Sequence, residues 1–471
     1  MKKIRLICVL LVITLVMGAI VRPASAAADA SVTNGCHSID ALKPLMPQEK
    51  KVETSKAVLL YDLSSDTLIY GWNLDEVIYP SSMVKLMTAL IALEKGDPSD
   101  RVVVTKRALS YVAIGSVSAG LEAGEEVTLE DLLYCMMAAS ANDAAVVIAE
   151  HIAGSQKAFV DMMNAKAKEL GLTNTNYSNV HGLHEELTYT TARDIGKLLG
   201  HALDDPYYRT LFEAKTYTMP ATNKSEERII HTTNYMMSKE VSKRYFDERV
   251  TGGKTGSTDQ AGRCLAITAD VNGIDLLGIV MGAVPTYEID GIALATFGSF
   301  EEMTQLMDYV EDAFEYRQIF FDNQAVQQYP VNGGANDVTV RPANTLSTVL
   351  PLNLDPKQLS WVYGPVGDSL TAPLKQGDVI STLQVWYGET CLAQTDLVAM
   401  TDVDIYTEPV RPATPVGFDE ELFGQIIAIV LGVIAVLAVI VLGGLMLTRW
   451  VRVAAAKSRR KRRRKEQRRR Y

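Results

Sequence analysis

Residues 79–96 read Tyr-Pro-Ser-Ser-Met-Val-Lys-Leu-Met-Thr-Ala-Leu-Ile-Ala-Leu-Glu-Lys-Gly, and the other motifs of the chain gain their meaning from this stretch. Pro80 and Ser81 are typical of a helix start, and apolar residues then recur at helical spacing. Gly96 ends the pattern and is followed by Asp97 and Pro98. The stretch therefore predicts one helix whose first turn begins at Pro80.

Ser82 and Lys85 lie three positions apart in that first turn, so their side chains share one face of the helix. A serine hydroxyl is a weak nucleophile until a neighbouring base takes its proton. An amine held against apolar residues can be that base, because burial disfavours its charged form and lowers its pKa. The free N–H groups of the helix start suit an oxyanion. An ordinary helix start with a solvated lysine is the alternative interpretation.

Two further motifs favour the catalytic interpretation. Ser-Ala-Asn at 140–142 lies between two apolar runs, and Lys-Thr-Gly at 254–256 lies in a glycine-rich, strand-like stretch. Ser-x-x-Lys, Ser-x-Asn and Lys-Thr-Gly, in this order, are the active-site motifs of penicillin-binding proteins and serine β-lactamases. Chance is a poor explanation for the three together.

The composition is that of a globular protein with a large core. The chain has 471 residues, of which 48% are hydrophobic and 22% are charged, and this is enough for two or three domains. The formal net charge is −10, but both ends are basic, so residues 27–448 carry −26. Such an acidic body argues against nucleic-acid binding by the folded part.

The N-terminal end has the pattern of a secretory signal peptide. Lys2, Lys3 and Arg5 precede an apolar run at 6–20, and Ala-Ser-Ala at 24–26 offers small residues for cleavage. A retained membrane anchor is the alternative. We expect the mature chain to begin near residue 27, outside the cytoplasm.

The C-terminal end predicts a membrane span. Residues 423–447 carry no charge, and 25 helical residues are long enough to cross a hydrocarbon layer of about 30 Å. Thirteen Lys and Arg residues follow at 449–471, which predicts a cytoplasmic tail. Contact with anionic lipid heads explains this tail better than nucleic-acid binding or nuclear localisation does. We therefore expect a cell-membrane protein with one C-terminal span and an extracytoplasmic body.

Between the two ends, periodicity predicts two units. Asn272-Gly273 between two apolar runs is the strongest hairpin signal of the chain. In the first unit we expect strands at 57–61, 67–70, 249–257, 263–271 and 274–281, and helices at 79–96, 128–136, 143–152, 156–170, 192–202 and 301–320. The five strands can form one antiparallel sheet, with the first five helices inserted between the second and third strands and the helix at 301–320 closing the unit. From residue 326 to residue 407 the pattern changes to short strands separated by Gly and Pro turns, which predicts a small β domain.

The sequence resembles the low-molecular-mass penicillin-binding proteins of the D-alanyl-D-alanine carboxypeptidase family. Besides the three motifs, the resemblance is carried by runs at 140–144, 154–159, 170–174, 179–183 and 192–194. It covers about residues 50–400 and implies the α/β (α+β) fold of serine β-lactamases and transpeptidases, which has a five-stranded antiparallel sheet and a helical subdomain. Together with the signals at the two ends of the chain, it predicts the following division: a signal peptide at 1–26, a polar segment at 27–54, a serine DD-peptidase domain at 55–322, a small β-sandwich domain at 326–407, a linker at 408–422, a transmembrane helix at 423–447 and a basic cytoplasmic tail at 448–471. The span is a departure from the family pattern, since some relatives end in an amphipathic interfacial helix instead.

The resemblance also implies roles for catalytic residues. Ser82 would attack the penultimate D-Ala carbonyl, and Lys85 would take its proton. Ser140 would relay a proton to the leaving D-Ala, and Asn142 would orient Lys85 and the substrate amide.

The Lys-Thr-Gly motif would bind the substrate. Lys254, Thr255, Gly256 and Ser257 are the expected substrate-binding residues. Lys254 and Thr255 would bind the terminal carboxylate or assist proton transfer, and the backbone N–H groups of Ser82 and Ser257 would form the oxyanion hole. Two lysines that converge on one cleft repel each other, which helps to keep Lys85 neutral.

The implied reaction is removal of the terminal D-Ala from peptidoglycan stem peptides, with β-lactams as covalent inhibitors. A DD-endopeptidase that cuts cross-links is the nearest alternative. A β-lactamase or a β-lactam-sensing receptor would share the fold. We find no Glu-x-x-x-Asn element between Ser140 and Lys254 that would supply a deacylating base, and the tail has no recognisable output domain.

No cofactor or metal is expected. His181, His184, Glu185 and Glu186 match no common zinc motif, and a loop or surface role suits these histidines better. No C-x-x-C is present, and the pairing of Cys36, Cys135, Cys264 and Cys391 stays open. Cys135 and Cys264 lie in apolar runs, which indicates core positions.

One departure from the family pattern concerns the substrate carboxylate. Family members often place an arginine after the last sheet strand, but no Lys or Arg occurs between Arg263 and Arg317 here. The aligned position is Ile289. We therefore expect slow release of D-Ala, unless Arg263, one strand away, reaches the cleft.

Overall fold

The computed structural model describes residues 44–45, 54–284, 298–367, 370–408 and 420–467. The expected signal peptide, most of the polar segment, Ile289 and Cys36 lie outside the described residues. The chain divides into two units after Ile405, and each unit is described by itself.

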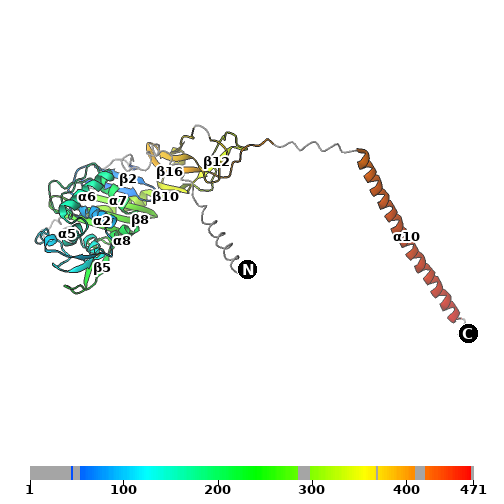
Figure 1. Ribbon diagram of the computed structural model, residues 1–471, viewed down its shortest axis with the longest axis horizontal. Coiled ribbons are helices and arrows are strands. Elements are labelled where there is room, and N and C mark those ends of the chain that lie inside the picture. The colour runs from blue at the N-terminus through cyan, green and yellow to red at the C-terminus, as the bar shows by residue number, and fades with distance from the viewer. Residues whose placement is uncertain (1–43, 46–53, 285–297, 368–369, 409–419, 468–471) are drawn as a thin grey trace, which may run out of the picture. The chain divides into compact units, whose positions relative to one another are not determined.

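The first unit contains the antiparallel sheet that the sequence predicts. Its strand order is β2-β1-β9-β8-β7, and Figure 1 labels β2 and β8 of this sheet. The strands are β1 (Ala57–Asp62), β2 (Thr67–Trp72), β7 (Val250–Thr258), β8 (Gly262–Val271) and β9 (Ile274–Ala283). Asn272 and Gly273 both have positive φ, 53° and 84°, as a two-residue hairpin loop between β8 and β9 requires. The expected hairpin is therefore confirmed.

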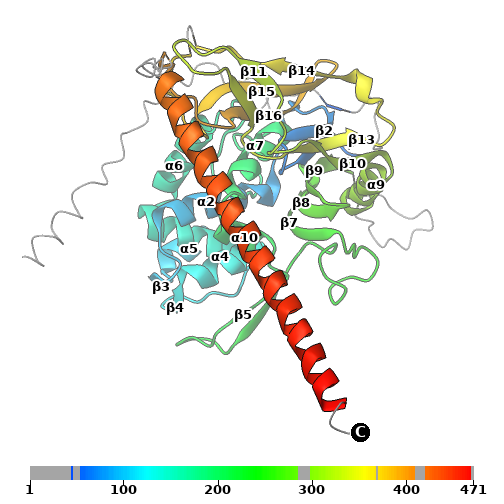
Figure 2. The same cartoon turned by 90° about the vertical axis from the view of Figure 1, so that its right-hand side faces the viewer.

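Helices cover both faces of this sheet, as Figure 2 shows, with α9 on one face and α2 on the other. The helices on the larger side are α2 (Val84–Lys95), α4 (Leu129–Met137), α5 (Asn142–Ala153), α6 (Gln156–Glu169), α7 (Ala192–Ala202) and α8 (Pro206–Phe212). The other face packs on α9 (Gly298–Ala313). All six residues of β1 are buried because successive side chains enter two different cores.

Local signals explain where these helices begin and end. Thr128 and Asp131 form the predicted capping box of α4. Gly154 ends α5 in the left-handed region, as expected from the sequence.

Several short elements carry too little periodicity to be foreseen. They are α3 (Lys106–Leu109) and the two-stranded sheets β3–β4 (Arg101–Val103 with Glu126–Thr128) and β5–β6 (Thr216–Met219 with Arg228–His231).

The helix predicted at 301–320 is wrong in its last turns. Residues Phe314–Phe320 form strand β10, which pairs with β13 (Leu346–Pro351). The segment reads Phe-Glu-Tyr-Arg-Gln-Ile-Phe and is rich in β-forming residues. Phe314 belongs to the core under α9 and Phe320 to the core of the β domain, so tertiary packing decides the conformation here.

The β domain consists of two sheets that share one core. The five-stranded sheet has the order β11-β12-β16-β15-β14 and the second sheet is the β10–β13 pair. The strands of the larger sheet are β11 (Gln327–Tyr329), β12 (Val338–Pro342), β14 (Leu359–Tyr363), β15 (Val379–Tyr387) and β16 (Thr390–Ala399). Thr67 Oγ1 lies 2.9 Å from Thr348 Oγ1, which ties β2 to β13.

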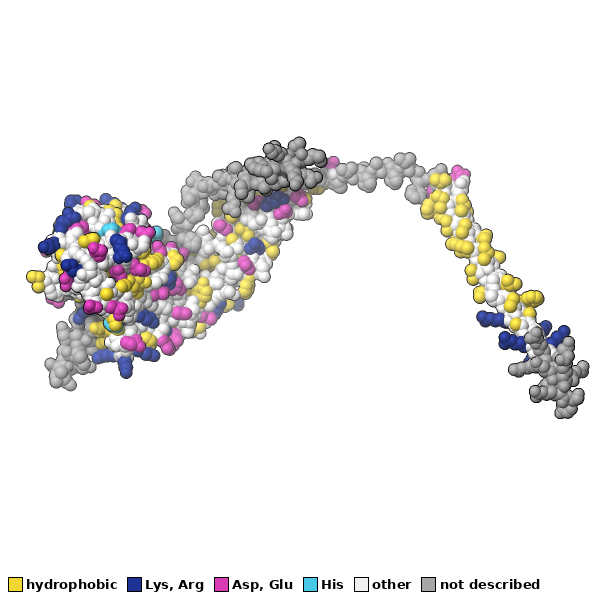
Figure 3. Space-filling model, turned by 60° about the horizontal axis from the view of Figure 1, so that its bottom comes forward, with side chains coloured by type: hydrophobic (Ala, Val, Ile, Leu, Met, Phe, Trp, Pro, Cys, Tyr) yellow, Lys and Arg dark blue, Asp and Glu magenta, His cyan; other side chains and the backbone are white. Residues whose placement is uncertain are grey.

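The second unit contains helix α10 (Glu420–Gln467). Its stretch at 420–461 is, within the described chain, the one helix long and apolar enough to cross a membrane. Figure 3 shows hydrophobic side chains along this helix and Lys and Arg side chains toward its end. The helix can anchor the protein in a membrane.

Candidate active site

Ser82 lies in a 3-10 turn, Ser81–Met83, that leads directly into α2. Its side chain is half-buried and lines a cavity of about 270 Å³. The preceding residue, Ser81, has φ of +50°, which is uncommon for a residue other than glycine. Such strained backbone is frequent at functional sites, because the surrounding structure must hold it in place.

Lys85 is fully buried one turn beyond Ser82, and its Nζ has three neighbours. Nζ donates to Asn142 Oδ1 at 2.7 Å and to the His181 carbonyl oxygen at 2.6 Å, and it lies 3.1 Å from Ser82 Oγ. Burial, reinforced by the charge of Lys254, holds the pKa of Lys85 well below its usual value.

These contacts suit a neutral amine. A neutral amine has two N–H groups and one lone pair. The amide and carbonyl oxygens can only accept, so they take the two N–H groups. The Ser82 hydroxyl accepts from Nζ while the amine is charged and can donate to it once the amine is neutral, and the lowered pKa of Lys85 favours the neutral form. The geometry is that of a base and its nucleophile.

Ser140 and Asn142 lie at the connection between α4 and α5, as the sequence predicts. Ser140 has φ of +61°, and Asn142 is the first residue of α5. Both side chains are almost completely buried. This turn directs the hydroxyl toward Lys254 and the carboxamide toward Lys85.

Lys254 extends from β7 and is 1% exposed. Its Nζ donates to Ser140 Oγ at 2.9 Å and to the Thr255 carbonyl oxygen at 3.0 Å. Burial lowers the pKa of Lys254 to about 7. The amine therefore links the sheet to Ser140 and can exchange a proton near neutral pH.

Two glycines let backbone pack closely around Ser82. A Cβ on Gly256 would lie 3.1 Å from the Pro80 carbonyl oxygen and 3.2 Å from the Ser82 nitrogen. A Cβ on Gly182, whose φ is +86°, would lie 1.9 Å from the Ser81 carbonyl oxygen. Glycine at position 256 therefore favours the close approach of strand β7 to the 3-10 turn.

The structure brings together all eight residues singled out in the sequence. Ser82, Ser140, Thr255, Gly256 and Ser257 line the cavity itself. Lys85, Asn142 and Lys254 stand behind it, joined to its wall by hydrogen bonds.

Sequence reasoning missed other residues around this site. Thr233 Oγ1 lies 2.6 Å from Thr255 Oγ1, and Thr233 lines the cavity. It lies in an irregular segment before β7, where no periodicity marks it. Likewise, His181 contributes its backbone oxygen rather than its imidazole. No side-chain pattern signals such a contribution.

Asp143 is a buried carboxylate that shapes the mouth of the cavity. Its oxygens accept hydrogen bonds from Ser118 Oγ and from the backbone N–H groups of Ala119 and Leu121. Val117, which lines the cavity, directly precedes this held segment, and its carbonyl oxygen accepts from the Asn142 N–H. Asp143 therefore fixes the segment against the start of α5.

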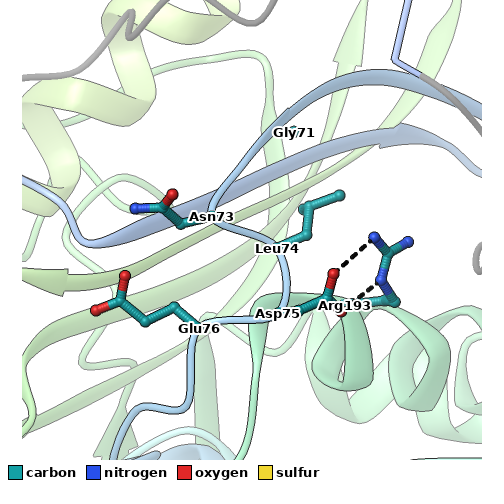
Figure 4. A pocket seen from close by; sticks show the side chains of 6 residues that line it. All are labelled: Gly71, Asn73, Leu74, Asp75, Glu76 and Arg193. Atoms are coloured by element: carbon teal, nitrogen blue, oxygen red, sulfur yellow. Dashed lines mark hydrogen bonds and ion pairs between the residues drawn. The ribbon is translucent and has the colours of Figure 1, made fainter.

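A second cavity, of about 320 Å³, lies between the end of β2 and the start of α7 (Figure 4). Its charged residues are Asp75, Glu76 and Arg193. The Arg193 guanidinium donates two hydrogen bonds, of 2.7 and 3.0 Å, to the Asp75 carboxylate. None of the six residues that line it is a serine or lysine, so this cavity lacks a nucleophile–base pair.

The two described free cysteines are buried, as the sequence indicated. Cys135 and Cys264 both lie in the larger core, and burial raises the pKa of the Cys264 thiol to about 11. Neither is a thiolate at neutral pH.

Comparisons with known proteins agree with this geometry. Residues 44–285 match the family described as D-alanyl-D-alanine carboxypeptidase, and residues 314–404 match the penicillin-binding protein 5 C-terminal domain. The D-alanyl-D-alanine carboxypeptidases DacF of Bacillus subtilis and DacC of Escherichia coli are each 29% identical, over 357 and 365 residues. These alignments cover 74% of this chain and 86% and 84% of the relatives.

A second kind of relative and a solved structure complete the comparison. The D-alanyl-D-alanine endopeptidase of Escherichia coli is 31% identical over 242 residues, which are 50% of this chain and 73% of the relative. The crystal structure of penicillin binding protein 5 from Haemophilus influenzae has a TM-score of 0.61 at 26% identity and covers 76% of this chain and 99% of that chain. With a family match over half of its length and the expected fold, the chain belongs to the D-alanyl-D-alanine carboxypeptidase family of hydrolases, among the low-molecular-mass penicillin-binding proteins.

Proposed function

We propose that this chain removes the terminal D-Ala from peptidoglycan stem peptides through an acyl-enzyme on Ser82. The observation that carries the proposal is the set of contacts of Lys85. Its Nζ donates to two oxygens that can only accept and lies 3.1 Å from Ser82 Oγ, and burial holds the pKa of Lys85 well below its usual value. A serine with a neutral, buried amine as its base is an activated nucleophile.

In the acylation step, Ser82 Oγ attacks the carbonyl carbon of the penultimate D-Ala and its proton passes to Lys85 Nζ. The backbone N–H groups of Ser82 and Ser257 stabilise the oxyanion of the tetrahedral intermediate. Asn142 orients both Lys85 and the substrate amide. The position of Ser82 and Ser257 in the cavity wall and the hydrogen bond between Lys85 and Asn142 support these roles.

Collapse of the intermediate breaks the peptide bond to the last D-Ala. Ser140 passes a proton to the leaving amine, and Lys254, hydrogen-bonded to Ser140, supplies it. Water then attacks the Ser82 ester: Lys85 returns its proton to Ser82 Oγ, Lys254 regains a proton from the water, and the shortened peptide leaves as its acid. A β-lactam acylates the same oxygen, with ring opening in place of D-Ala release.

The proposed setting is the outer face of the cell membrane. Helix α10 would span the bilayer, the basic tail would contact lipid heads in the cytoplasm, and residues 55–407 would stand outside as a catalytic domain and a β domain. Peptidoglycan is found only on that side, which agrees with the expected signal peptide.

Substitution of the nucleophile tests the reaction. Ser82→Ala should abolish covalent labelling by a fluorescent penicillin and release of D-Ala from a pentapeptide, because no oxygen remains to acylate. Ser81→Ala is the neighbouring control, since the Ser81 Oγ has no hydrogen-bond partner. Labelling of Ser82→Ala at the wild-type level would disprove the assignment.

The same assay should include a cross-linked peptide dimer. The endopeptidase relative makes this substrate relevant, and mass spectrometry separates the two products. We expect free D-Ala from the pentapeptide to form faster than monomers from the dimer. The reverse order would make the chain a DD-endopeptidase.

A further inference from the structure

We propose that Arg263 binds the terminal carboxylate of the substrate and is the residue by which this chain selects a free peptide end. The inference rests on the proposed function, because it names the group that recognises the substrate of the Ser82 cavity. It also names the group that takes the place of the arginine that family members often carry after the last sheet strand and that this sequence lacks.

The covalent structure of the substrate determines where its carboxylate lies relative to the oxyanion donors. In a peptide ending in D-Ala-D-Ala, the carboxylate lies one residue beyond the scissile carbonyl. Its binding group must therefore stand on the leaving-group side of the oxyanion donors. Ser257 is one proposed donor, and its own hydroxyl already contacts Arg263: Arg263 Nη1 donates to Ser257 Oγ at 2.7 Å.

Strand pairing places Arg263 at this point. Ser257 on β7 and Arg263 on β8 are direct partners across the ladder. Side chains of direct partners point to the same face of a sheet. On its other side, the β8–β9 pairing shifts register between Arg263 and Leu265, and such a bulge re-aims side chains near active sites.

Charge singles out Arg263 among its neighbours. Of the described residues that line the cavity, it is the one with a permanent positive charge. Lys254 is a weaker candidate, since it is 1% exposed and its Nζ is held by Ser140 Oγ and the Thr255 carbonyl oxygen. Burial also lowers the pKa of Lys254 to about 7, whereas the guanidinium of Arg263 stays protonated at any working pH.

The guanidinium suits this ligand. It presents five N–H donors in a planar fork, so one group can hold Ser257 Oγ and also grip a carboxylate by two parallel bonds. Thr255 and Ser257 add hydroxyls on the same wall of the cavity. The arrangement fits a small carboxylate better than an uncharged chain end.

The test varies the residue and the substrate together. The substrates are one pentapeptide ending in D-Ala-D-Ala and the same peptide with a C-terminal carboxamide, and mass spectrometry follows release of D-Ala and of D-alaninamide. Arg263→Gln should lower kcat/KM for the free acid by about 10- to 150-fold, the effect of one charge-assisted hydrogen bond, and change the amide by less than about threefold. Arg263→Lys, which keeps the charge without the fork, should fall between.

Arg107→Gln is the matched control, because it removes the same charge from a side chain that is exposed on α3 and bonded to Glu150. It should leave both substrates unchanged. If Arg263→Gln lowered kcat/KM equally for the free acid and the amide, Arg263 would only support the cavity wall. If this variant kept the wild-type preference for the free acid over the amide, another group would bind the carboxylate. Either result overturns the inference. If the wild type cleaved neither substrate, the proposed function itself would fail.

Discussion

The chemistry of single residues at this site depends on Lys85 being neutral. Lys85→Arg keeps a basic side chain of similar length but replaces the amine by a group that stays protonated at any working pH. We expect acylation by penicillin to fall by at least about a hundredfold, the usual contribution of a general base. Stopped-flow or gel-based labelling measures this, and a loss of less than tenfold would place the base elsewhere.

The same residue predicts a pH dependence. Burial and Lys254 lower the pKa of Lys85, so the neutral fraction rises as pH rises through that lowered pKa. Acylation by penicillin should therefore increase with pH and level off well below pH 10.5, the ordinary value for lysine. An acid limb close to pH 10.5 would show that Lys85 keeps its ordinary pKa.

At the residue scale, the side chains of the candidate site could be predicted from the sequence, but its backbone groups could not. Ser82 and Lys85 are foreseeable because a spacing of three in a helix is rigid, whereas Ser140 and Lys254 needed the resemblance to be joined to them. The acceptor on His181 is a carbonyl oxygen, which every residue carries, so no residue type reveals it. The sequence places Arg263 one strand away from the Lys-Thr-Gly motif. Its direct pairing with Ser257 depends on the register between β7 and β8, which the sequence alone does not give.

At the scale of the elements, the 3-10 turn that carries Ser82 packs closely against the loop that contains Gly182. Gly182→Ala would put a Cβ 1.9 Å from the Ser81 carbonyl oxygen and 2.9 Å from the Ser82 nitrogen. The turn and the loop must then separate, which moves an oxyanion donor and the His181 carbonyl that holds Lys85. We expect acylation by penicillin to fall by more than about tenfold, because a displaced oxyanion donor alone costs more than that.

Gly171→Ala controls for backbone strain in this comparison. Gly171 also has positive φ, +66°, but a Cβ there would meet nothing within 4 Å. This variant should lose about 1 kcal/mol of unfolding free energy, the cost of a strained backbone position, and keep its acylation rate. Similar acylation rates for the two alanine variants would show that Gly182 serves only the conformation of its loop.

Elements with strong periodicity were predictable, and the exceptions have physical causes. The Asn272-Gly273 hairpin fixes β8 and β9 locally, and the apolar residues of α7 define one face, whereas α2 is buried on every side over Val84–Ala92. At Phe314–Phe320 local pattern and tertiary packing disagree, because the ends of the segment belong to different cores. A single sequence window cannot contain that information.

For the whole molecule, charge and hydropathy predict an orientation that can be measured. Residues 423–447 are uncharged, and the thirteen basic residues at 449–471 oppose transfer across the membrane. Protease added to intact spheroplasts should therefore remove the penicillin-labelled body and spare a tag placed after Tyr471. Lysed spheroplasts, in which the tag should also be lost, show that the protease can reach it.

Replacing the basic residues tests the cause of this orientation. If the cationic tail holds the C-terminal end inside, exchanging most of its Lys and Arg residues for Gln should weaken retention, because each basic residue near an anionic leaflet contributes about 1 kcal/mol. A growing fraction of the tag should then become sensitive to protease in intact spheroplasts. A tag digested already in the wild type would reverse the orientation and place Ser82 in the cytoplasm, away from peptidoglycan. The proposed substrate of the Ser82 cavity therefore depends on this result.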